Sequence, residues 1–287
     1  MDEPLLGLLV GVIQGIVEWL PVSSEGTVSI VLTGLDVAAD EATSFALVLH
    51  GGTAIAATVY YRDVLRDLLR RVPGWRPTSA FDAASSDLSF YALATLASGI
   101  TGVAGYLVLE EVTTALAGGA FLALIGALLL VTGVVLWVGE REAGTHDDDS
   151  AGVGGPGTAV VTARSEPTAT DAVLVGLLQG VAVLPGISRS GTTVSALLLR
   201  GYEGPAALQF SFVLSIPAAF GAGLVAYVQS GLPGISPLSA GLALLASAVV
   251  GYATVDGLTR LASRLAFSRI CIGFGALAVA GGVLVIV

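Results

Sequence analysis

The sequence is poor in charge, in cysteine and in histidine, and it contains no lysine at all. Charged residues make up 12% of its 287 residues, whereas about a quarter of an average soluble domain is charged. The single cysteine, Cys271, excludes a disulfide framework and a cysteine–metal site. So little charge cannot cover the surface of a soluble globular protein, and that class is excluded. No nucleic-acid partner is expected.

Apolar residues are abundant instead: 54% of the residues are hydrophobic, and the mean hydropathy is +0.88. Several apolar runs reach the roughly 20 residues that a helix needs to cross about 30 Å of hydrocarbon. The sequence therefore predicts an all-α integral membrane protein. Ten apolar segments are expected, near residues 5–20, 23–34, 43–61, 88–109, 115–138, 171–184, 189–200, 206–228, 237–256 and 269–287.

Six of these segments are long enough to span the bilayer, and the other four form two pairs interrupted by Pro21 and Pro185. Half-length apolar pieces on either side of a polar turn are typical of re-entrant hairpins, which enter and leave the membrane on the same side. The predicted architecture is six transmembrane helices plus two re-entrant helical hairpins.

The two hairpin regions resemble each other in sequence. Residues 9–27 read LVGVIQGIVEWLPVSSEGT, and residues 174–192 read LVGLLQGVAVLPGISRSGT. The shared order of Gln-Gly, Leu-Pro and a Ser-rich turn ending in Gly-Thr favours an internal repeat. The predicted units are a first repeat at 1–138 with its hairpin at 5–34, an acidic, Gly-rich cytoplasmic linker at 139–170, and a second repeat at 171–287 with its hairpin at 171–200. Each repeat adds three spans to its hairpin.

The placement of arginine predicts the orientation. Arginines gather in the loops at 62–87, 139–170 and 257–269, and the positive-inside rule places these loops in the cytoplasm. The first hairpin then opens to the outside and the second to the cytoplasm. The halves therefore have opposite topology, so the sequence predicts an inverted repeat whose broken helices meet near the midplane. We expect a multi-pass protein of the cell membrane.

The charge that is present is mostly acidic, with 22 Asp and Glu against 12 Arg and a net charge of −10. An acidic surface without lysine is typical of the proteins of extreme halophiles, in which surface charge maintains solubility. An acidic patch for a basic partner is the alternative interpretation. His146 lies in this acidic loop sequence, next to Asp147, and is not expected to take part in chemistry.

Three ionisable residues lie at predicted membrane depth, where charge is costly and usually functional. Glu18 follows Gln14 by one helical turn, so the two side chains share a face. Glu25 lies in the first polar turn and Arg189 in the second. The alternatives are a structural Glu18–Arg189 pair, an Arg189 that reaches the membrane surface, and a Glu25 exposed to water at the rim.

The two polar turns suit an oxyanion ligand. Small residues at the start of a half-helix leave backbone N–H groups free, and the helix dipole favours an anion there. Ser and Thr hydroxyls add donors, and an arginine matches a phosphate with two hydrogen bonds. Two such turns facing each other would hold two phosphoryl groups, and a carboxylate beside them would bind a divalent cation or act as a general base. At membrane depth, the substrate's tail would lie in lipid.

At this point the motifs resemble those of a known family. Gln14-x-x-x-Glu18 followed by Leu-Pro-Val-Ser-Ser-x-Gly, and later Pro-Gly-x-Ser-Arg-Ser-x-x-Thr, is similar to the undecaprenyl-diphosphatases, also called bacitracin-resistance proteins. The resemblance covers essentially the whole chain. It implies inverted repeats with two re-entrant regions. It also implies removal of the terminal phosphate from a polyprenyl (undecaprenyl-type) diphosphate, which leaves the monophosphate carrier lipid.

The resemblance implies roles for individual residues. Gln14 and Glu18 take the acidic-motif positions and would hold a divalent cation, Mg²⁺ or Ca²⁺. Ser24 takes the position of the candidate nucleophile, and Arg189 takes that of the phosphate-binding arginine. The other substrate-binding positions implied are Ser23, Thr27, Ser188, Ser190, Gly191 and Thr193.

One position departs from the family pattern. Thr27 stands where the first motif usually has a histidine, so a mechanism that uses that histidine cannot be transferred. His50, in the next span and flanked by small residues, is the candidate replacement, and a hydrogen-bonded structural histidine is the alternative. Whether Ser24 or a base-activated water attacks the phosphorus stays open.

The leading hypothesis is a membrane polyprenyl-diphosphate phosphatase that a divalent cation assists, with the lipid diphosphate and the bilayer as partners. A transporter or lipid flippase is the alternative, because inverted repeats with broken helices also build alternating-access proteins. Hydroxyl-rich turns beside Glu18 favour hydrolysis, since they supply a nucleophile, a base and an oxyanion clamp together. A homodimer is a possible assembly.

Overall fold

The computed structural model describes residues 3–116, 118–149, 166–231, 235–262 and 267–286, and within them every regular element is a helix. Six helices in these ranges are long and apolar enough to cross a membrane. They are α3 (Ala39–Tyr60), α5 (Ser86–Ala115), α6 (Gly119–Asp149), α9 (Gly204–Ser230), α10 (Pro237–Ala262) and α11 (Phe267–Ile286). The protein is therefore an all-helical membrane protein, as the sequence predicts.

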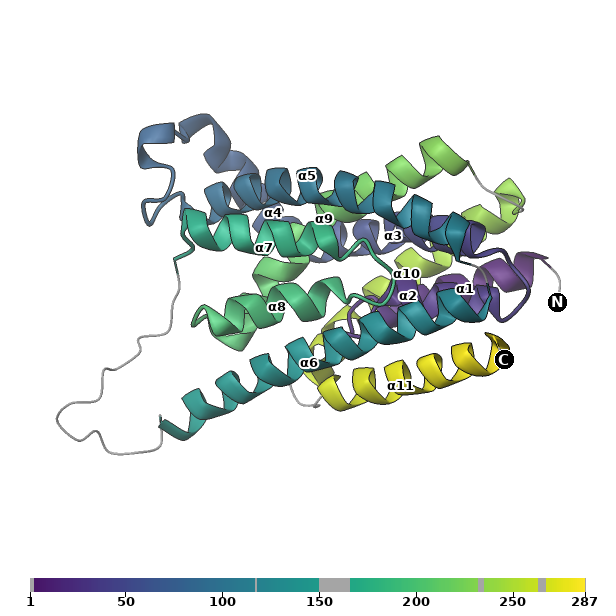
Figure 1. Cartoon of the computed structure of the whole chain (residues 1–287). Helices are drawn as coiled ribbons and strands as arrows, with labels where there is room; N and C mark the ends of the chain where they lie inside the picture. The colour runs from purple at the N-terminus through teal and green to yellow at the C-terminus, as the bar shows by residue number, and fades with distance from the viewer. Residues whose placement is uncertain (1–2, 117, 150–165, 232–234, 263–266, 287) are drawn as a thin grey trace.

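The remaining apolar helices are short and come in two pairs. The first pair is α1 (Glu3–Val17) and α2 (Ser24–Thr33), and the second is α7 (Ala169–Val181) and α8 (Arg189–Leu199). In Figure 1 the two pairs enter the molecule from opposite ends, and their polar turns meet near its middle. Both chain termini lie at the end from which α1 enters. This arrangement brings residues from the two halves of the sequence to one place.

Each short pair packs against a long helix from the other half of the chain. Helix α1 lies along α10 and α7 lies along α5, while α3 packs on α9 and α6 on α11. The glycines of the repeated Gln-Gly step make this approach possible. A Cβ atom at Gly15 would lie 2.8 Å from the backbone nitrogen of Gly251 on α10. At Gly180 it would lie 2.6 Å from the nitrogen of Gly102 on α5, so a larger residue at either position would force the helices apart.

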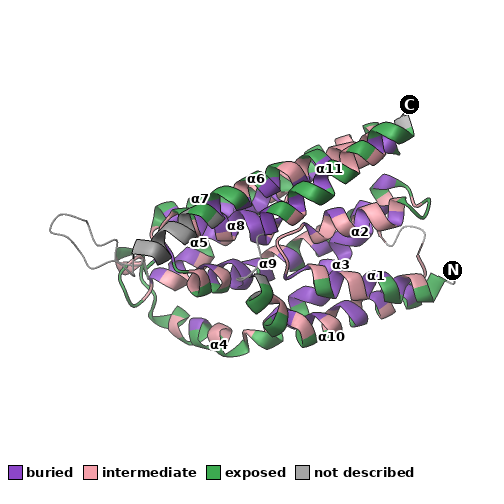
Figure 2. Ribbon diagram, turned by 90° about the horizontal axis from the view of Figure 1, so that it is seen from below, coloured by how far each residue is buried: buried purple, intermediate pink, exposed green. Residues whose placement is uncertain are grey.

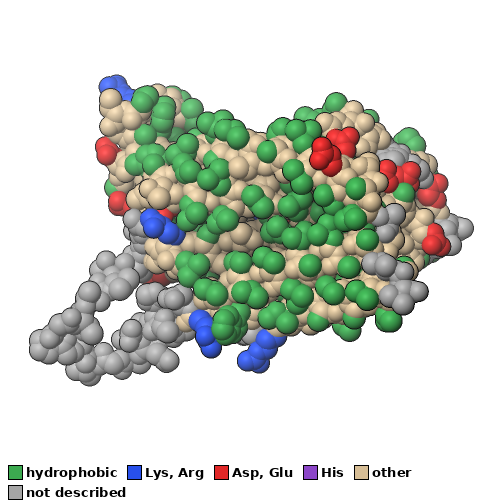
Figure 3. Space-filling view, viewed as in Figure 1, with side chains coloured by type: hydrophobic (Ala, Val, Ile, Leu, Met, Phe, Trp, Pro, Cys, Tyr) green, Lys and Arg blue, Asp and Glu red, His purple; other side chains and the backbone are tan. Residues whose placement is uncertain are grey.

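The surface agrees with a membrane environment. Buried residues gather in the interior, along α3 and α8 (Figure 2), whereas large apolar side chains such as Leu224, Leu245 and Leu277 are exposed on the outer helices. In Figure 3, apolar side chains spread over the middle of the visible face. The arginines seen there lie toward the end opposite the termini, whereas acidic side chains are seen at both ends.

Two regions differ from the sequence-based expectation. The loop at 62–87 contains an amphipathic helix, α4 (Arg62–Arg71), which apolar runs could not reveal because one of its faces is charged. Helix α6 continues through Asp149, so the beginning of the expected linker at 139–170 is helical. Residues 150–165 of that linker, and the side chain of His146, lie outside the described residues.

Candidate active site

Glu18 lies at the end of α1 and is almost completely buried, with 4% of its surface exposed. Its backbone nitrogen donates to the carbonyl of Gln14 at 3.0 Å, which extends the helical path by one residue. The spacing therefore brings the two side chains together, as predicted, and Gln14 Nε2 donates to Glu18 Oε2 at 2.9 Å. Gln14 is itself fully buried and holds the carboxylate from behind.

Ser24 and His50 lie directly against this carboxylate. Ser24 Oγ donates to Glu18 Oε2 at 2.8 Å and lies 3.2 Å from His50 Nε2. His50 comes from the middle of α3, and its Nδ1 lies 2.8 Å from the carbonyl of Ala46. Because a carbonyl only accepts, Nδ1 carries a hydrogen. In a neutral imidazole Nε2 then has a lone pair that can accept the Ser24 hydrogen when that hydrogen turns away from Glu18. Nε2 is also 3.2 Å from Glu18 Oε2, so the carboxylate would stabilise a protonated ring.

Ser23 fixes the turn that presents Ser24. It caps α2, since its Oγ accepts from the backbone nitrogen of Gly26 at 3.2 Å. The same oxygen accepts from the nitrogen of Gly186, in the second turn, at 2.9 Å. Its φ of 58° is unusual for a residue other than glycine. Such a conformation persists where surrounding contacts enforce it, and here both turns supply these contacts.

The second turn repeats this local structure. Ser188 caps α8 by accepting from the nitrogen of Gly191 at 3.1 Å, just as Ser23 caps α2. Ser24 and Arg189 are therefore equivalent, each being the first residue of its helix. The guanidinium of Arg189 donates through Nη2 to Glu18 Oε1. This buried ion pair connects the two halves of the sequence. The other terminal nitrogen of Arg189, Nη1, has no hydrogen-bond partner among the described residues.

The predicted site residues separate into two groups. Seven of them line one small pocket: Glu18, Ser23, Ser24, His50, Ser188, Arg189 and Ser190. The others are not among the residues that line it. Thr27 donates to the carbonyl of Ser23, Thr193 bonds to Ser211 on α9, and Gly191 packs against Ser188. A hydroxyl in the first turn of a helix readily bonds to the preceding turn, and sequence alone does not reveal this choice.

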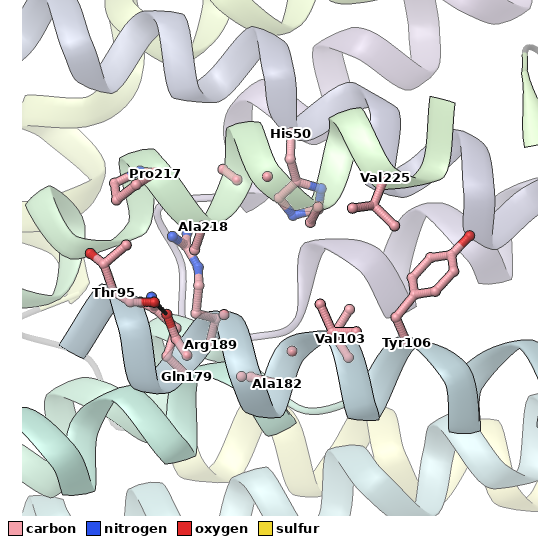
Figure 4. A pocket seen from close by; sticks show the side chains of 18 of the residues that line it. His50, Thr95, Val103, Tyr106, Gln179, Ala182, Arg189, Pro217, Ala218 and Val225 are labelled. Carbon is pink, nitrogen blue, oxygen red and sulfur yellow. Dashed lines mark hydrogen bonds between the residues drawn. The ribbon is translucent and has the colours of Figure 1, made fainter. Parts of the chain in front are cut away.

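A larger, mostly apolar cavity lies beside the small pocket, between α5, α7 and α9. Glu25, His50, Ala182 and Arg189 line both spaces, so the two adjoin. Figure 4 shows His50 and Arg189 on the walls of the cavity, with Val103, Tyr106 and Val225 farther along it. The sequence did not single out this cavity, because its walls are the apolar and small residues of ordinary spans.

Two polar residues near these spaces were not predicted as site residues. Glu25 lies beside Ser24, and its Oε1 is 3.7 Å from His50 Nε2. Gln179 is the counterpart of Gln14 in the repeat, but its Nε2 donates to Ser98 and to the carbonyl of Leu214, both at 3.3 Å. The internal repeat in the sequence aligns Gln179 with Gln14. The aligned repeats also show that the carboxylate position one turn later, occupied by Glu18 in the first half, is Val183 in the second, so Gln179 has no carboxylate to orient.

Comparison with known proteins agrees with this geometry. The profile of the family described as bacitracin resistance protein BacA matches residues 7–277. The chain belongs to the BacA family. It is 47% identical to an undecaprenyl-diphosphatase of Haloarcula marismortui, over 99% of each chain. It is 35% identical to proteins of the same name from Methanococcoides burtonii, over 95% of this chain and 96% of the relative, and Methanothrix thermoacetophila, over 97% and 96%.

Within the BacA family, the position of Thr27 raises the question of which residue supplies a histidine beside Ser24. The motif resemblance puts a histidine at this position in most of the family, one turn of α2 beyond the serine. Here the imidazole comes from α3 instead, and His50 lies within 3.2 Å of Ser24 Oγ. The serine of this BacA protein therefore still has a histidine beside it. The expectation of a halophilic source also fits the relative from Haloarcula marismortui.

Proposed function

We propose that this protein is a membrane diphosphatase that hydrolyses a polyprenyl (undecaprenyl-type) diphosphate to the monophosphate carrier lipid and inorganic phosphate. The supporting observation is the cluster of Ser24, His50, Glu18 and Arg189 where the two helical turns meet. It combines a hydroxyl nucleophile, an imidazole that can take up its proton, and a cation for phosphate. The names of the curated relatives agree with this activity.

The diphosphate group fits between the two turns. Helices α2 and α8 both begin here, at Ser24 and Arg189, so two positive helix ends face the site. The Nη1 atom of Arg189 is buried without a hydrogen-bond partner among the described residues, so it is available to a phosphate oxygen. Ser190 contributes a hydroxyl from the same turn. Together these groups stabilise the negative charge that develops on the transferred phosphoryl group.

The chemical step that the geometry favours begins at Ser24. Its Oγ attacks the terminal phosphorus, and its proton passes to His50 Nε2. The bond between that phosphorus and the bridging oxygen breaks, and the lipid monophosphate leaves with the electron pair. His50 gives this proton to the leaving monophosphate, so the ring is neutral again. It then deprotonates a water molecule that attacks the phosphoserine, and Ser24 Oγ takes the proton back as inorganic phosphate leaves. Glu18 stabilises the protonated imidazole, because its Oε2 lies 3.2 Å from Nε2.

The apolar cavity supports a lipid substrate. It begins at Arg189 and His50, at the edge of the small polar pocket, and continues between α5 and α9 along Val103 and Val225. A prenyl chain attached to a bound diphosphate would leave the polar pocket in this direction. Burial of apolar surface there contributes binding energy of about 25 cal/mol per Å².

A divalent cation, Mg²⁺ or Ca²⁺, fits the chemistry of the donor set, because the carboxylates of Glu18 and Glu25 and the amide oxygen of Gln14 are hard oxygen ligands. The oxygen of Gln14 and one of Glu25 are buried without a hydrogen-bond partner in the described part of the chain. That part contains no group of three His, Cys, Asp or Glu side chains placed to hold an ion. Phosphate oxygens of the substrate would therefore complete the coordination. When bound, the cation would supply charge neutralisation for the diphosphate.

The placement in the membrane is also part of the proposal. The Arg-bearing loops at 62–87, 139–170 and 257–269 face the cytoplasm, and the pair α1–α2 re-enters from the outside while α7–α8 re-enters from the cytoplasm. The opposite directions of the two pairs support this assignment (Figure 1). A homodimer stays a prediction. The transporter alternative is not favoured, because the relatives carry the name of a phosphatase and the site holds a nucleophile beside a base.

Phosphate release from a polyprenyl diphosphate by the purified protein in detergent tests the proposal. The wild type should release phosphate, EDTA should abolish the release, and excess Mg²⁺ or Ca²⁺ should restore it. Ser24→Ala should fall to background, and acid quenching of the wild type should trap a phosphoserine at Ser24.

The same variant distinguishes the two attacking groups. If water attacks directly, Ser24→Ala loses only a hydrogen bond, which costs about 1–3 kcal/mol or roughly ten- to a hundredfold in rate. A variant that keeps a tenth of the wild-type rate, with no trapped phosphoenzyme, would exclude Ser24 as the nucleophile. A wild type that releases no phosphate would refute the diphosphatase activity itself.

A further inference from the structure

Glu25 is the one acidic residue of the site to which the family motifs give no role. It is in the first turn of α2, directly after Ser24, and 12% of its side chain is exposed. It lines both the small polar pocket and the apolar cavity. The carboxylate therefore lies at the junction between the space for the diphosphate and the space for the lipid tail.

The carboxylate of Glu25 is poorly paired for a group so enclosed. Its Oε2 is buried and has no hydrogen-bond partner among the described residues, and its Oε1 is 3.7 Å from His50 Nε2, beyond hydrogen-bonding distance. Arg189, the nearby cation, pairs with Glu18 instead. An enclosed carboxylate whose one ion-pair neighbour is a histidine at 3.7 Å is costly, so a closer cation that the protein chain does not supply is expected.

Asp171 shows how this chain treats a buried carboxylate with a structural role. One oxygen accepts from Arg200 Nε at 2.6 Å, and the other accepts from the hydroxyls of Tyr202 at 2.9 Å and Thr168 at 2.6 Å. Both oxygens of Asp171 are thus satisfied by side chains from the same half of the protein. The contrast with the unpaired oxygen of Glu25 argues against a structural role for Glu25.

The contacts of Glu18 point in the same direction. Its Oε2 accepts from Gln14 and Ser24, and its Oε1 accepts from Arg189. Gln14 presents its N–H₂ group to Glu18, so it orients that carboxylate. Of the two carboxylates that line the small pocket, Glu18 accepts hydrogen bonds at both oxygens, whereas neither oxygen of Glu25 has a donor within hydrogen-bonding distance among the described residues. The two carboxylates approach the same nitrogen, His50 Nε2, at 3.2 and 3.7 Å, so they lie beside each other.

We propose that Glu25 is a ligand of the divalent cation that binds together with the diphosphate, next to Glu18 and on the side that faces the tail cavity. The inference rests on the proposed function, because the diphosphate completes the coordination. Mg²⁺ in particular is commonly held by one or two carboxylates together with substrate phosphates. The motif resemblance assigns the cation to Gln14 and Glu18, and Glu25 lies outside that assignment.

Mn²⁺ binding tests the proposal without turnover. The wild type, Glu25→Gln and Glu25→Ser are titrated with Mn²⁺ in the presence of methylenediphosphonate, a diphosphate analogue with a carbon bridge, and free Mn²⁺ is measured by electron paramagnetic resonance. Glu25→Ser introduces the residue that the second turn has at the equivalent position, Ser190. Both variants should bind Mn²⁺ at least tenfold more weakly than the wild type. Glu110→Gln, which removes an exposed carboxylate on α5, is the control and should bind within twofold of the wild type.

Wild-type affinity in either folded Glu25 variant would overturn the proposal, and so would a wild type that binds no Mn²⁺ under these conditions. A crystal structure of the wild type with Mn²⁺ and the analogue gives an answer that needs no variant: the anomalous peak should lie within about 2.6 Å of a Glu25 oxygen. A peak elsewhere refutes the assignment. Phosphate release by the wild type is measured in parallel, so failure of the diphosphatase proposal is seen separately from failure of the ligand proposal.

Discussion

At the scale of single residues, the site depends on contacts between side chains that are far apart in the sequence. Glu18 receives hydrogen bonds from Gln14, four residues before it, from Ser24, six residues after it, and from Arg189, in the other half of the chain. Each donor lowers the energy of the buried negative charge. Removing one of these donors should therefore lower the rate of hydrolysis more than it lowers the stability of the fold, as long as the others remain.

Arg189→Lys should lower kcat/KM by at least tenfold although the charge is retained. Lysine is a point charge on a flexible stem, and it cannot contact Glu18 and a phosphate oxygen in the fixed geometry of a guanidinium. Steady-state phosphate release measures the effect. Arg260→Lys, at an exposed arginine on α10, is the matched control and should behave as the wild type. Near-normal turnover in Arg189→Lys would remove Arg189 from the phosphate site.

His50→Gln should lower kcat by about a hundredfold or more, because general-base catalysis typically contributes 10²–10⁴. The change keeps a polar side chain beside Ala46, so folding should be preserved. A second substitution, Thr27→His, should restore part of the rate, since residue 27 lies one helical turn from Ser24 and takes the usual position of the family's histidine. Single-turnover kinetics of the single and double variants provide the comparison. A His50→Gln enzyme with the wild-type rate would make His50 structural.

At the scale of helices, the repeated Gln-Gly step has two separable roles. Its glutamines differ in function, since Gln14 supports Glu18 whereas Gln179 bonds to Ser98 on α5. Its glycines share one function, because both permit a short helix to approach a long helix from the other half. The glycine is therefore the part of the repeat that packing requires in both halves.

Gly180→Ala should lower the unfolding temperature, because the new methyl group would lie 2.6 Å from the backbone nitrogen of Gly102. Overpacking of this kind costs about 1–3 kcal/mol. Gly241→Ala on α10 is the control, since no described atom outside its own stretch of helix lies within 4 Å of the added carbon. There the change should leave stability equal or slightly higher, because alanine favours a helix over glycine by about 1 kcal/mol. Thermal unfolding in detergent measures both. Equal stability of the two variants would contradict the packing interpretation.

At the scale of the whole molecule, the proposed orientation rests on the arrangement of charge and on the directions of the two short helix pairs. The lone cysteine, Cys271, is buried, so single cysteines placed elsewhere report their own exposure to a membrane-impermeant maleimide. Leu35→Cys, between α2 and α3, should react in intact cells. Thr78→Cys, in the loop at 62–87, should react only after permeabilisation. The reverse pattern would invert the proposed orientation while leaving the fold unchanged.

Much of the architecture was accessible from the sequence for physical reasons. The bilayer fixes the length of a span at about 20 apolar residues, so the six long helices could be located from composition. The broken segments around Pro21 and Pro185 could be recognised because each is too short to cross. The contact between Gln14 and Glu18 followed from the helical period. Helix α4 was missed, because one of its faces is charged and no apolar run marks it.

The sequence by itself thus determined which segments prefer lipid, where they break and which residues share a face of one helix, since these properties depend on composition and period. Only the tertiary structure decided that His50 reaches Ser24, that Arg189 pairs with Glu18, and that Thr27 and Thr193 bond within the fold rather than line the pocket. These contacts depend on how each helix is rotated about its axis and how closely it approaches its neighbours. The rotation and the approach of each helix are set by the simultaneous packing of all the helices, and no local pattern in the sequence can predict that packing.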